Sequence, residues 1–193
     1  MSKGKEPFNY GSISGVNYGA KLAPPAKKLK AFGELLGDDW DDGVNDNVRK
    51  ITVAYDELGV KSIKFEYTYE TNIVVGDDHG YMAKDDKKKE FELNFKKEYI
   101  ISVEGNYGKK LPPSGPVRDT IEALRNEYMT MLKFETNIAT YTVPPEIDHK
   151  RGYQYVVTPF KLIWEGHKIV GFYGKSTTRI QRIGVYVKPI GDA

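Results

Sequence analysis

The sequence predicts an all-β protein built from three similar antiparallel sheets around one core. Three segments share an alternation of apolar and polar residues, the pattern of a strand with one buried face. Each follows another apolar run that we interpret as its partner strand. Aromatic residues make up 12% of the chain, with 14 tyrosines, which also favours β structure. The expected strand pairs are Ile51–Tyr55 with Val60–Glu66, Tyr99–Val103 with Met129–Glu135, and Lys168–Tyr173 with Ile180–Tyr186.

The inward positions of these strands should form the core. The three copies are spaced unevenly along the chain, which argues against a solenoid with a fixed period. We therefore expect one closed core, built from Ile51, Val53, Ile63, Phe65, Ile101, Val103, Leu132, Phe134, Ile169, Ile183 and Val185.

The N-terminal segment differs from the rest of the chain. Residues 1–27 are rich in Gly, Lys, Asn and Tyr and contain the Pro24–Pro25 pair near their end, so we interpret them as an extension or linker. The domain itself is expected over 28–193. An edge strand is the alternative for this segment, because it also holds apolar residues such as Phe8 and Ile13.

One internal segment has a helical pattern. Val117, Ile121, Leu124 and Tyr128 recur at helical spacing, which predicts a short helix inserted between two strands. An irregular loop leading into the next strand is the alternative.

Composition limits the classes of partner. The 29 basic and 27 acidic residues leave a net charge of only +2, and the basic run Lys84–Glu90 is interrupted by acids. We expect no nucleic-acid partner, because such proteins carry a basic stripe. No apolar run is long enough to span a membrane, and the first residues lack the pattern of a signal peptide. The lack of a signal-peptide pattern leads us to expect a cytoplasmic or nucleocytoplasmic protein, and the absence of cysteine fits a reducing compartment.

The sequence contains no recognisable catalytic or metal-binding pattern. His79, His149 and His167 are too far apart in sequence for a zinc motif. A calcium loop starting at Asp39 would need a glutamate at its twelfth position, where Lys50 stands. No nucleophile, phosphate-loop or dinucleotide motif occurs. We therefore expect no enzyme activity and no cofactor.

Eight short motifs follow one another along the chain: Trp40–Gly43, Ile63–Tyr67, His79–Gly80, Phe91–Phe95, Glu98–Gly105, Leu132–Asn137, Gly166–Lys175 and Ile183–Val187. In this order they resemble the jacalin-related lectins of plants. The resemblance covers about residues 28–189 and is greatest to the myrosinase-binding and β-glucosidase-aggregating branch.

The resemblance implies a β-prism of three four-stranded antiparallel sheets with pseudo-threefold symmetry. It also implies a sugar site between a glycine-rich N-terminal loop and a C-terminal loop of pattern Gly-x-x-x-Asp, bordered by the loop before Met129. The corresponding segments here are Gly33–Gly37 and Thr177–Gln181. The candidate carbohydrate-binding residues are therefore Leu36, Gly37, Asn126, Glu127, Thr177, Thr178, Arg179 and Gln181.

The sequence departs from the lectin pattern at each anchor. Thr177 stands in place of the glycine and Gln181 in place of the aspartate, while Leu36 falls on the glycine whose N–H faces the sugar. Glutamine is neutral, so it lacks the charged acceptor that strengthens a hydrogen bond to a hydroxyl. We expect an altered and weakened sugar site.

Two functions remain open at this point. The chain is either a lectin that binds a carbohydrate or glycoprotein, or a lectin-fold module that binds a protein such as a plant β-glucosidase. A hydrolase is disfavoured because no catalytic constellation is present. The resemblance also suggests a homodimer.

Overall fold

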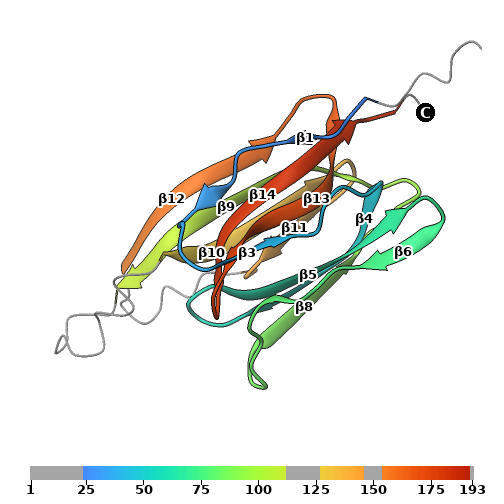
Figure 1. Ribbon diagram of the computed structural model, residues 1–193. Helices are drawn as coiled ribbons and strands as arrows, with labels where there is room; N and C mark the ends of the chain where they lie inside the picture. Colours follow the sequence, from blue (N-terminus) through green and yellow to red (C-terminus); the bar gives the residue numbers. More distant parts are fainter. Residues whose placement is uncertain (1–23, 112–126, 146–153, 192–193) are drawn as a thin grey trace, which may run out of the picture.

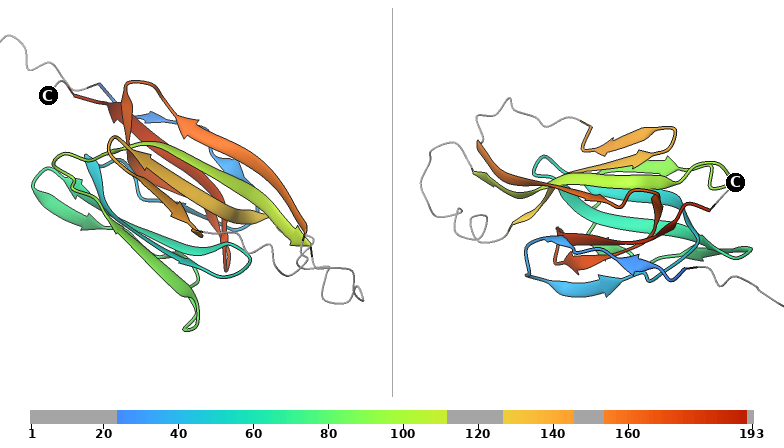
Figure 2. Two further views of the ribbon diagram at one scale, coloured as in Figure 1. Left: turned by 180° about the vertical axis from the view of Figure 1, so that it is seen from behind. Right: turned by 90° about the horizontal axis from the view of Figure 1, so that it is seen from above.

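The computed structural model describes residues 24–111, 127–145 and 154–191, which form three antiparallel sheets (Figure 1). Sheet A has the order β1-β14-β13-β3, with β2 also pairing β14. Sheet B has the order β6-β5-β4-β8, with β7 also pairing β5, and sheet C has the order β11-β10-β9-β12. Each sheet thus has a path of four strands, and together they enclose one interior (Figure 2).

The strand bounds follow the sheets. Sheet A contains β1 (Lys27–Lys28), β2 (Phe32–Gly33), β3 (Asp38–Asp41), β13 (His167–Ser176) and β14 (Ile180–Pro189). Sheet B contains β4 (Asn47–Tyr55), β5 (Val60–Tyr69), β6 (Asn72–Val75), β7 (His79–Gly80) and β8 (Lys87–Glu92). Sheet C contains β9 (Ile100–Leu111), β10 (Tyr128–Thr136), β11 (Thr140–Val143) and β12 (Gln154–Ile163).

The predicted strand pairs are confirmed as the centre of each sheet. They form the hairpins β4–β5, β9–β10 and β13–β14, and each repeat lies on the second strand of its hairpin. The all-β prediction is also confirmed, because the described part of the chain contains strands and no helix. It follows that the described residues include no long apolar helix of the kind that crosses a membrane.

Each hairpin carries two register shifts at equivalent positions. Near the start of the second strand the pairing skips the second residue of the repeat, which is Lys61, Thr130 or Gln181. Near the start of the first strand it skips Arg49, Ile101 or Val170. Such β-bulges bend a strand and strengthen its twist, which suits sheets that wrap around a common core. The pseudo-threefold symmetry therefore extends to the irregularities of the sheets.

Three phenylalanines, one from each sheet, meet in the core. Phe65 of sheet B stacks on Phe172 of sheet A with ring centroids 3.9 Å apart, and Phe134 of sheet C lies edge-on to both, at 6.4 and 6.2 Å. All three are fully buried. Their cross-strand partners are smaller: Ile51 faces Phe65, Val103 faces Phe134 and Val185 faces Phe172. Each sheet thus contributes one ring and one β-branched side chain to this layer.

The core prediction is confirmed for all the named residues except Ile101. The other ten are 0–1% exposed, whereas Ile101 is only partly buried. The reason is the bulge, since Thr136 pairs with Ile100 and Glu135 with Ser102, so the pairing skips Ile101. The extra residue reverses the alternation of faces, and Ile100 is the residue that becomes fully buried.

A buried polar cluster joins sheet A to sheet B. The Asp42 carboxylate accepts a hydrogen bond from the Tyr67 hydroxyl at 2.6 Å and lies 2.7 Å from His79 Nε2, and the His79 ring stacks on Trp40 at 4.0 Å. Burial, reinforced by the adjacent carboxylate, raises the pKa of Tyr67 well above its usual value, so the hydroxyl remains a donor. The sequence motif that contains Trp40 and Asp42 therefore packs against the motif that contains His79. Tyr67 and His79 supply the polar partners that a buried carboxylate such as Asp42 requires.

Two predicted segments lie largely outside the described residues. The helix expected over 117–128 falls there except for its end, where Tyr128 is the first residue of β10. Of the N-terminal segment, only residues from 24 onward are described, and β1 begins at Lys27, one residue before the expected domain boundary.

Truncating a core ring should strongly destabilise the domain. Phe134→Ala should lower the free energy of unfolding by about 3–5 kcal/mol, because it removes a buried ring and leaves a cavity. Urea denaturation followed by circular dichroism would measure the loss. The matched control is Phe95→Ala, at a ring that is 39% exposed, which should cost less than about 1 kcal/mol. Equal effects of the two changes would contradict the assigned core.

Two N-terminal truncations should have different effects. Removing residues 1–23 should shift the thermal midpoint by less than about 2 °C, since it leaves the described sheets intact. Removing residues 1–29 also deletes β1, the Leu29 N–H bond to Val185 O at 2.9 Å and the Tyr173 hydroxyl bond to Leu29 O at 2.5 Å. That truncation should lower the midpoint by roughly 5 °C or more. Calorimetry of both chains would measure this, and a large loss with the shorter truncation would favour the edge-strand interpretation.

Candidate functional site

The two loops named by the sequence meet at one end of sheet A. The Glu34 N–H donates to Gln181 O at 3.1 Å, and Lys175 Nζ donates to Gly37 O at 3.3 Å. Gly33 and Gly37 have φ angles of 115° and 100°, which favour glycine. A Cβ at Gly37 would lie 2.6 Å from Ser176 O, and one at Gly33 would lie 2.0 Å from Gln181 O. The loops can approach this closely only because both positions are glycine.

Gln181 uses its amide inside the C-terminal loop. Its Oε1 accepts the Thr177 N–H at 2.8 Å, and its Nε2 donates to Thr177 Oγ1 at 2.8 Å. The side chain is only 2% exposed. The bulge at Gln181 allows this orientation, since Ile180 pairs with Ser176 and Arg182 with Lys175. Gln181 therefore shapes the loop, and its hydrogen-bonding groups are not presented to a ligand.

Arg179 ties three sheets together at this end of the molecule. Its guanidinium forms two hydrogen bonds to the carboxylate of Asp56 in the β4–β5 loop, one of them 3.0 Å from Nη1 to Oδ1. It also lies over the Tyr128 ring at the start of β10, 5.0 Å from the ring centroid. The bidentate pair holds the loop of sheet A against sheet B, and the contact with Tyr128 holds it against sheet C.

Asp56 is held in its charged form by its neighbours. Burial raises the pKa of its carboxyl, but the hydrogen bonds and charge of Arg179, with the N–H groups of Leu58 and Gly59, outweigh this and leave the pKa below its usual value. The Leu58 N–H lies 2.8 Å from Asp56 Oδ1. A charged pair and backbone N–H groups thus hold the Asp56 carboxylate in place in the β4–β5 loop.

The exposed part of the site is largely apolar or neutral. Leu36 is 45% exposed, and Thr177 and Thr178 are exposed beside it, whereas the Arg179 side chain is only 15% exposed. The Cγ2 methyl of Thr177 lies 3.2 Å from the position that a Cβ on Gly37 would take. The structure thus brings Leu36, Gly37 and the C-terminal loop together, while Asn126 lies outside the described residues.

Glu127 lines a neighbouring pocket of about 460 Å³ between sheets A and C. Phe32 and Tyr107 form aromatic walls, and Arg182 fixes the N-terminal loop by donating to Gly33 O at 2.8 Å and Ala31 O at 3.0 Å. Sequence reasoning missed Tyr107 and Arg182, because only the folded register places β9 beside this loop. The remaining lining residues are Lys30, Ala31, Gly33, Glu34 and Leu35.

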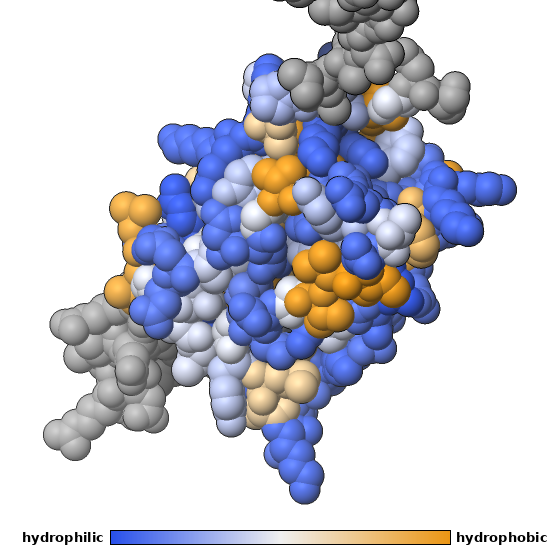
Figure 3. Space-filling view, turned by 45° about the vertical axis from the view of Figure 1, so that its right-hand side comes forward, coloured by the Kyte–Doolittle hydropathy of each residue, from blue (hydrophilic) through white to orange (hydrophobic). Residues whose placement is uncertain are grey.

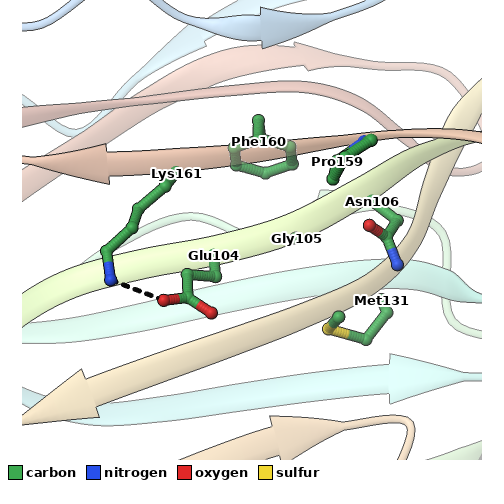
Figure 4. Close-up of a pocket in the computed structure, with 7 residues that line it drawn as sticks. All are labelled: Glu104, Gly105, Asn106, Met131, Pro159, Phe160 and Lys161. Atoms are coloured by element: carbon green, nitrogen blue, oxygen red, sulfur yellow. Dashed lines mark hydrogen bonds and ion pairs between the residues drawn. The ribbon is translucent and has the colours of Figure 1, made fainter.

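A second pocket, of about 380 Å³, lies on sheet C (Figure 4). The Glu104 carboxylate is paired there with Lys161 at 2.6 Å and Lys133 at 2.8 Å. Asn106, Met131 and Pro159 also line it. Lys161 also lies 3.9 Å from the Glu135 carboxylate, so two lysines and two glutamates neutralise one another across the strands. This surface therefore offers a weaker candidate site than the loops of sheet A.

Comparison with known proteins decides the family. The jacalin-like lectin domain matches residues 29–186, which is most of the chain. The chain belongs to this family. Jacalin-related lectin 45 of Arabidopsis thaliana is 38% identical over 191 residues, 99% of this chain and 38% of that protein. Jacalin-related lectin 17 of Arabidopsis thaliana is 38% identical over 172 residues, 88% of this chain and 25% of that protein. The chain therefore corresponds to a part of these longer lectins.

Other relatives include a partner-binding protein and sugar-binding lectins. PYK10-binding protein 2 of Arabidopsis thaliana is 37% identical over 180 residues, 90% of this chain and 54% of that protein. The mannose-binding lectin from Champedak has a TM-score of 0.65 and 28% identity, covering 86% of this chain and 99% of that one. A mannose-specific lectin from Morus nigra has a TM-score of 0.66 at 23% identity, over 88% and 99% of the chains. The β-prism inferred from the sequence is thus the fold of this chain.

The Arg179–Asp56 pair predicts a pH-dependent contribution to stability. Asp56→Asn should lower the free energy of unfolding at pH 7 by about 1–2 kcal/mol, because it removes a half-buried charged pair. The folded state holds the pKa of Asp56 below 3.8, its ordinary value, so the unfolded state binds the proton more readily. The stabilisation is therefore complete above about pH 4–5 and is lost as the pH falls through the folded pKa.

Urea denaturation of both proteins between pH 7 and pH 2.5 would measure the difference. Asp85→Asn, at an exposed acid, is the matched control and should differ little from the wild type at any pH. A stability gap for Asp56→Asn that stays constant down to pH 2.5 would contradict the role of the charge.

Proposed function

We propose that this chain is a carbohydrate-binding lectin whose site is altered and binds simple monosaccharides weakly. The observation that carries the proposal is the arrangement of the two loops. Gly33 and Gly37 allow the close approach that builds the site. The groups offered to a ligand differ, however, because Gln181 is turned into its own loop and Arg179 is paired with Asp56.

An extended glycan suits this surface better than a single sugar. Leu36 and Thr177 add bulk where the family pattern has glycine, so a monosaccharide has little room to contact the backbone. The exposed Thr178 hydroxyl remains on one side. On the other side the adjoining pocket offers the Tyr107 ring and the Glu127 carboxylate. Aromatic faces and carboxylates are suitable groups for sugar C–H bonds and hydroxyls.

The proposal includes no catalysis. The loops 33–37 and 177–181 contain one carboxylate, Glu34, and no histidine or cysteine, so they hold neither a nucleophile paired with a histidine base nor the pair of acids that glycoside hydrolysis uses. The Asp56 carboxylate beside these loops is neutralised by Arg179.

The second candidate is a lectin-fold module that binds a protein partner. PYK10-binding protein 2, similar over most of this chain, carries a protein-binding function in its name. A β-glucosidase-type protein is the partner class that the family resemblance suggests. This candidate is favoured if the loops bind no glycan.

A triple substitution should restore monosaccharide binding. Leu36→Gly and Thr177→Gly remove the bulk, and Gln181→Asp supplies a charged acceptor. The combined change should tighten binding of methyl mannoside by about tenfold to a hundredfold, the worth of one charged hydrogen bond. Isothermal titration calorimetry would measure it, with the wild type expected to bind more weakly than about 1 mM.

The matched control is Leu35→Gly, which adds a glycine to the same loop at a side chain that lines the other pocket. This change should leave the affinity for methyl mannoside unchanged. Millimolar or tighter binding by the wild type would refute the weakened site. A folded triple variant that binds no better than the wild type would favour the protein-binding candidate.

A further inference from the structure

The edge strand β6 has an unusual surface. All four of its residues, Asn72–Val75, are exposed, and three of them are aliphatic, with Ile73 at 56%, Val74 at 37% and Val75 at 59%. An apolar patch is visible on the side of the molecule that carries β6 (Figure 3). Proteins normally protect the edges of their sheets with charges, proline or bulges.

The other edges of the described sheets are protected in this way. β8 contains three lysines and two glutamates, β12 contains Pro159 and Lys161, β3 contains three aspartates, and β1 is two lysines. β11 is protected differently, since its only aliphatic residue, Val143, is buried. β12 also exposes Val156, Val157 and Ile163, but Pro159 and Lys161 lie between them. Among these edges, β6 is the one that exposes aliphatic side chains and contains neither a charged residue nor a proline.

The backbone of β6 is directed to accept another strand. Gly76 donates its N–H to Phe65 O at 2.9 Å, and Val74 faces Tyr67 in the register with β5. Because inward and outward groups alternate along an antiparallel strand, the N–H and C=O groups of Ile73 and Val75 point away from β5. Two outward hydrogen-bonding residues with apolar side chains form a template for an added strand.

The template is also held rigidly. The β5–β6 turn contains Glu70, whose φ angle is 54°, and its N–H donates to Asp46 Oδ2 at 2.6 Å. Asp46 is in turn paired with Lys188 at 3.1 Å. An edge that is already ordered loses little conformational entropy on binding.

The charges around β6 select the occupant. Exposed carboxylates flank the strand at both ends, Glu70 before it and Asp77 and Asp78 after it. Lys64 pairs with Asp78 at 2.9 Å, which leaves the flanks acidic overall. A second copy pairing antiparallel about Val74 would place Glu70 opposite Asp78, and like charges directly opposite are destabilising.

We propose that β6 is a docking site for an extended segment of another protein, with β-branched or aliphatic residues in alternation and Lys or Arg at both ends. The segment would continue sheet B, its main chain bonding to Ile73 and Val75 and its cations facing Glu70 and Asp77. This surface is independent of the sugar proposal. The Asp56–Gly59 loop precedes β5, whereas the β6 turn follows it, so the two lie at opposite ends of β5.

Disulfide tethering can test the proposal, because the chain has no cysteine. Thr71→Cys places one thiol in the exposed turn beside β6. Three peptides, each ending in a flexible glycine-linked cysteine, compete for it in a thiol buffer. The first alternates valine and threonine between pairs of lysines. The second has proline at its central valine, and the third has glutamates in place of the lysines. Mass spectrometry measures the capture ratios.

The first peptide should be captured about fivefold more than either competitor, as expected for a few favourable cross-strand and charge pairs. Adding Val75→Pro should abolish its advantage over the proline peptide. This change removes an outward N–H without touching the bonds to β5, and edge strands tolerate proline. Circular dichroism should show an unchanged fold.

Three outcomes would overturn the proposal. Equal capture of all three peptides would mean that β6 accepts no strand. An advantage over the proline peptide that survives Val75→Pro would mean that capture does not depend on main-chain pairing with β6. Concentration-dependent dimerisation of the wild type in sedimentation, abolished by Val75→Pro, would identify a second copy as the occupant.

Discussion

The packing of Phe65, Phe134 and Phe172 is the constraint on which the rest of the structure depends. Three sheets can enclose one interior only if each presents a similar volume to the centre, because protein cores are close-packed. The repeats at first seem to break this rule, since the third has Val185 where the others have phenylalanine. The missing ring is supplied by Phe172 on the neighbouring strand. The three sheets therefore contribute similar side-chain volumes to the core. The ring can come from either strand of the hairpin.

The bulges connect this core to the functional loops. Lys61, Thr130 and Gln181 occupy the same place in the three sheets, immediately after a hairpin connection. At each, the extra residue is released from regular pairing and takes a local task. Lys61 pairs with Asp86 at 2.9 Å, Thr130 donates to Asn106 O at 3.2 Å, and Gln181 closes its own loop. The bulge bends each sheet, and the residue that it frees from pairing differs among the three sheets and makes a different contact in each.

The fold was predictable from the sequence because period-two alternation and motif order record which faces are buried. The burial of Phe65 and Phe134 followed directly from that pattern. Ile101 was not predictable, since one skipped residue reverses the faces and leaves no mark in local composition. The pairing of Arg179 with Asp56 was also out of reach, because it joins positions 123 residues apart. Tyr107 lines the neighbouring pocket because of the register of the sheet, and no short sequence motif indicates that position.

The candidate site separates geometry from chemistry. Positive φ angles at Gly33 and Gly37 and the close approach to Ser176 and Gln181 give the two loops their contact. The polar groups that could face a ligand are nevertheless engaged within the protein, Gln181 by Thr177 and Arg179 by Asp56. A group already satisfied by the protein gains little by exchanging that partner for a sugar hydroxyl, because the net value of one hydrogen bond is small. If the proposed function holds, affinity has to come from contacts beyond these two loops, and a larger ligand can make more of them than a single sugar.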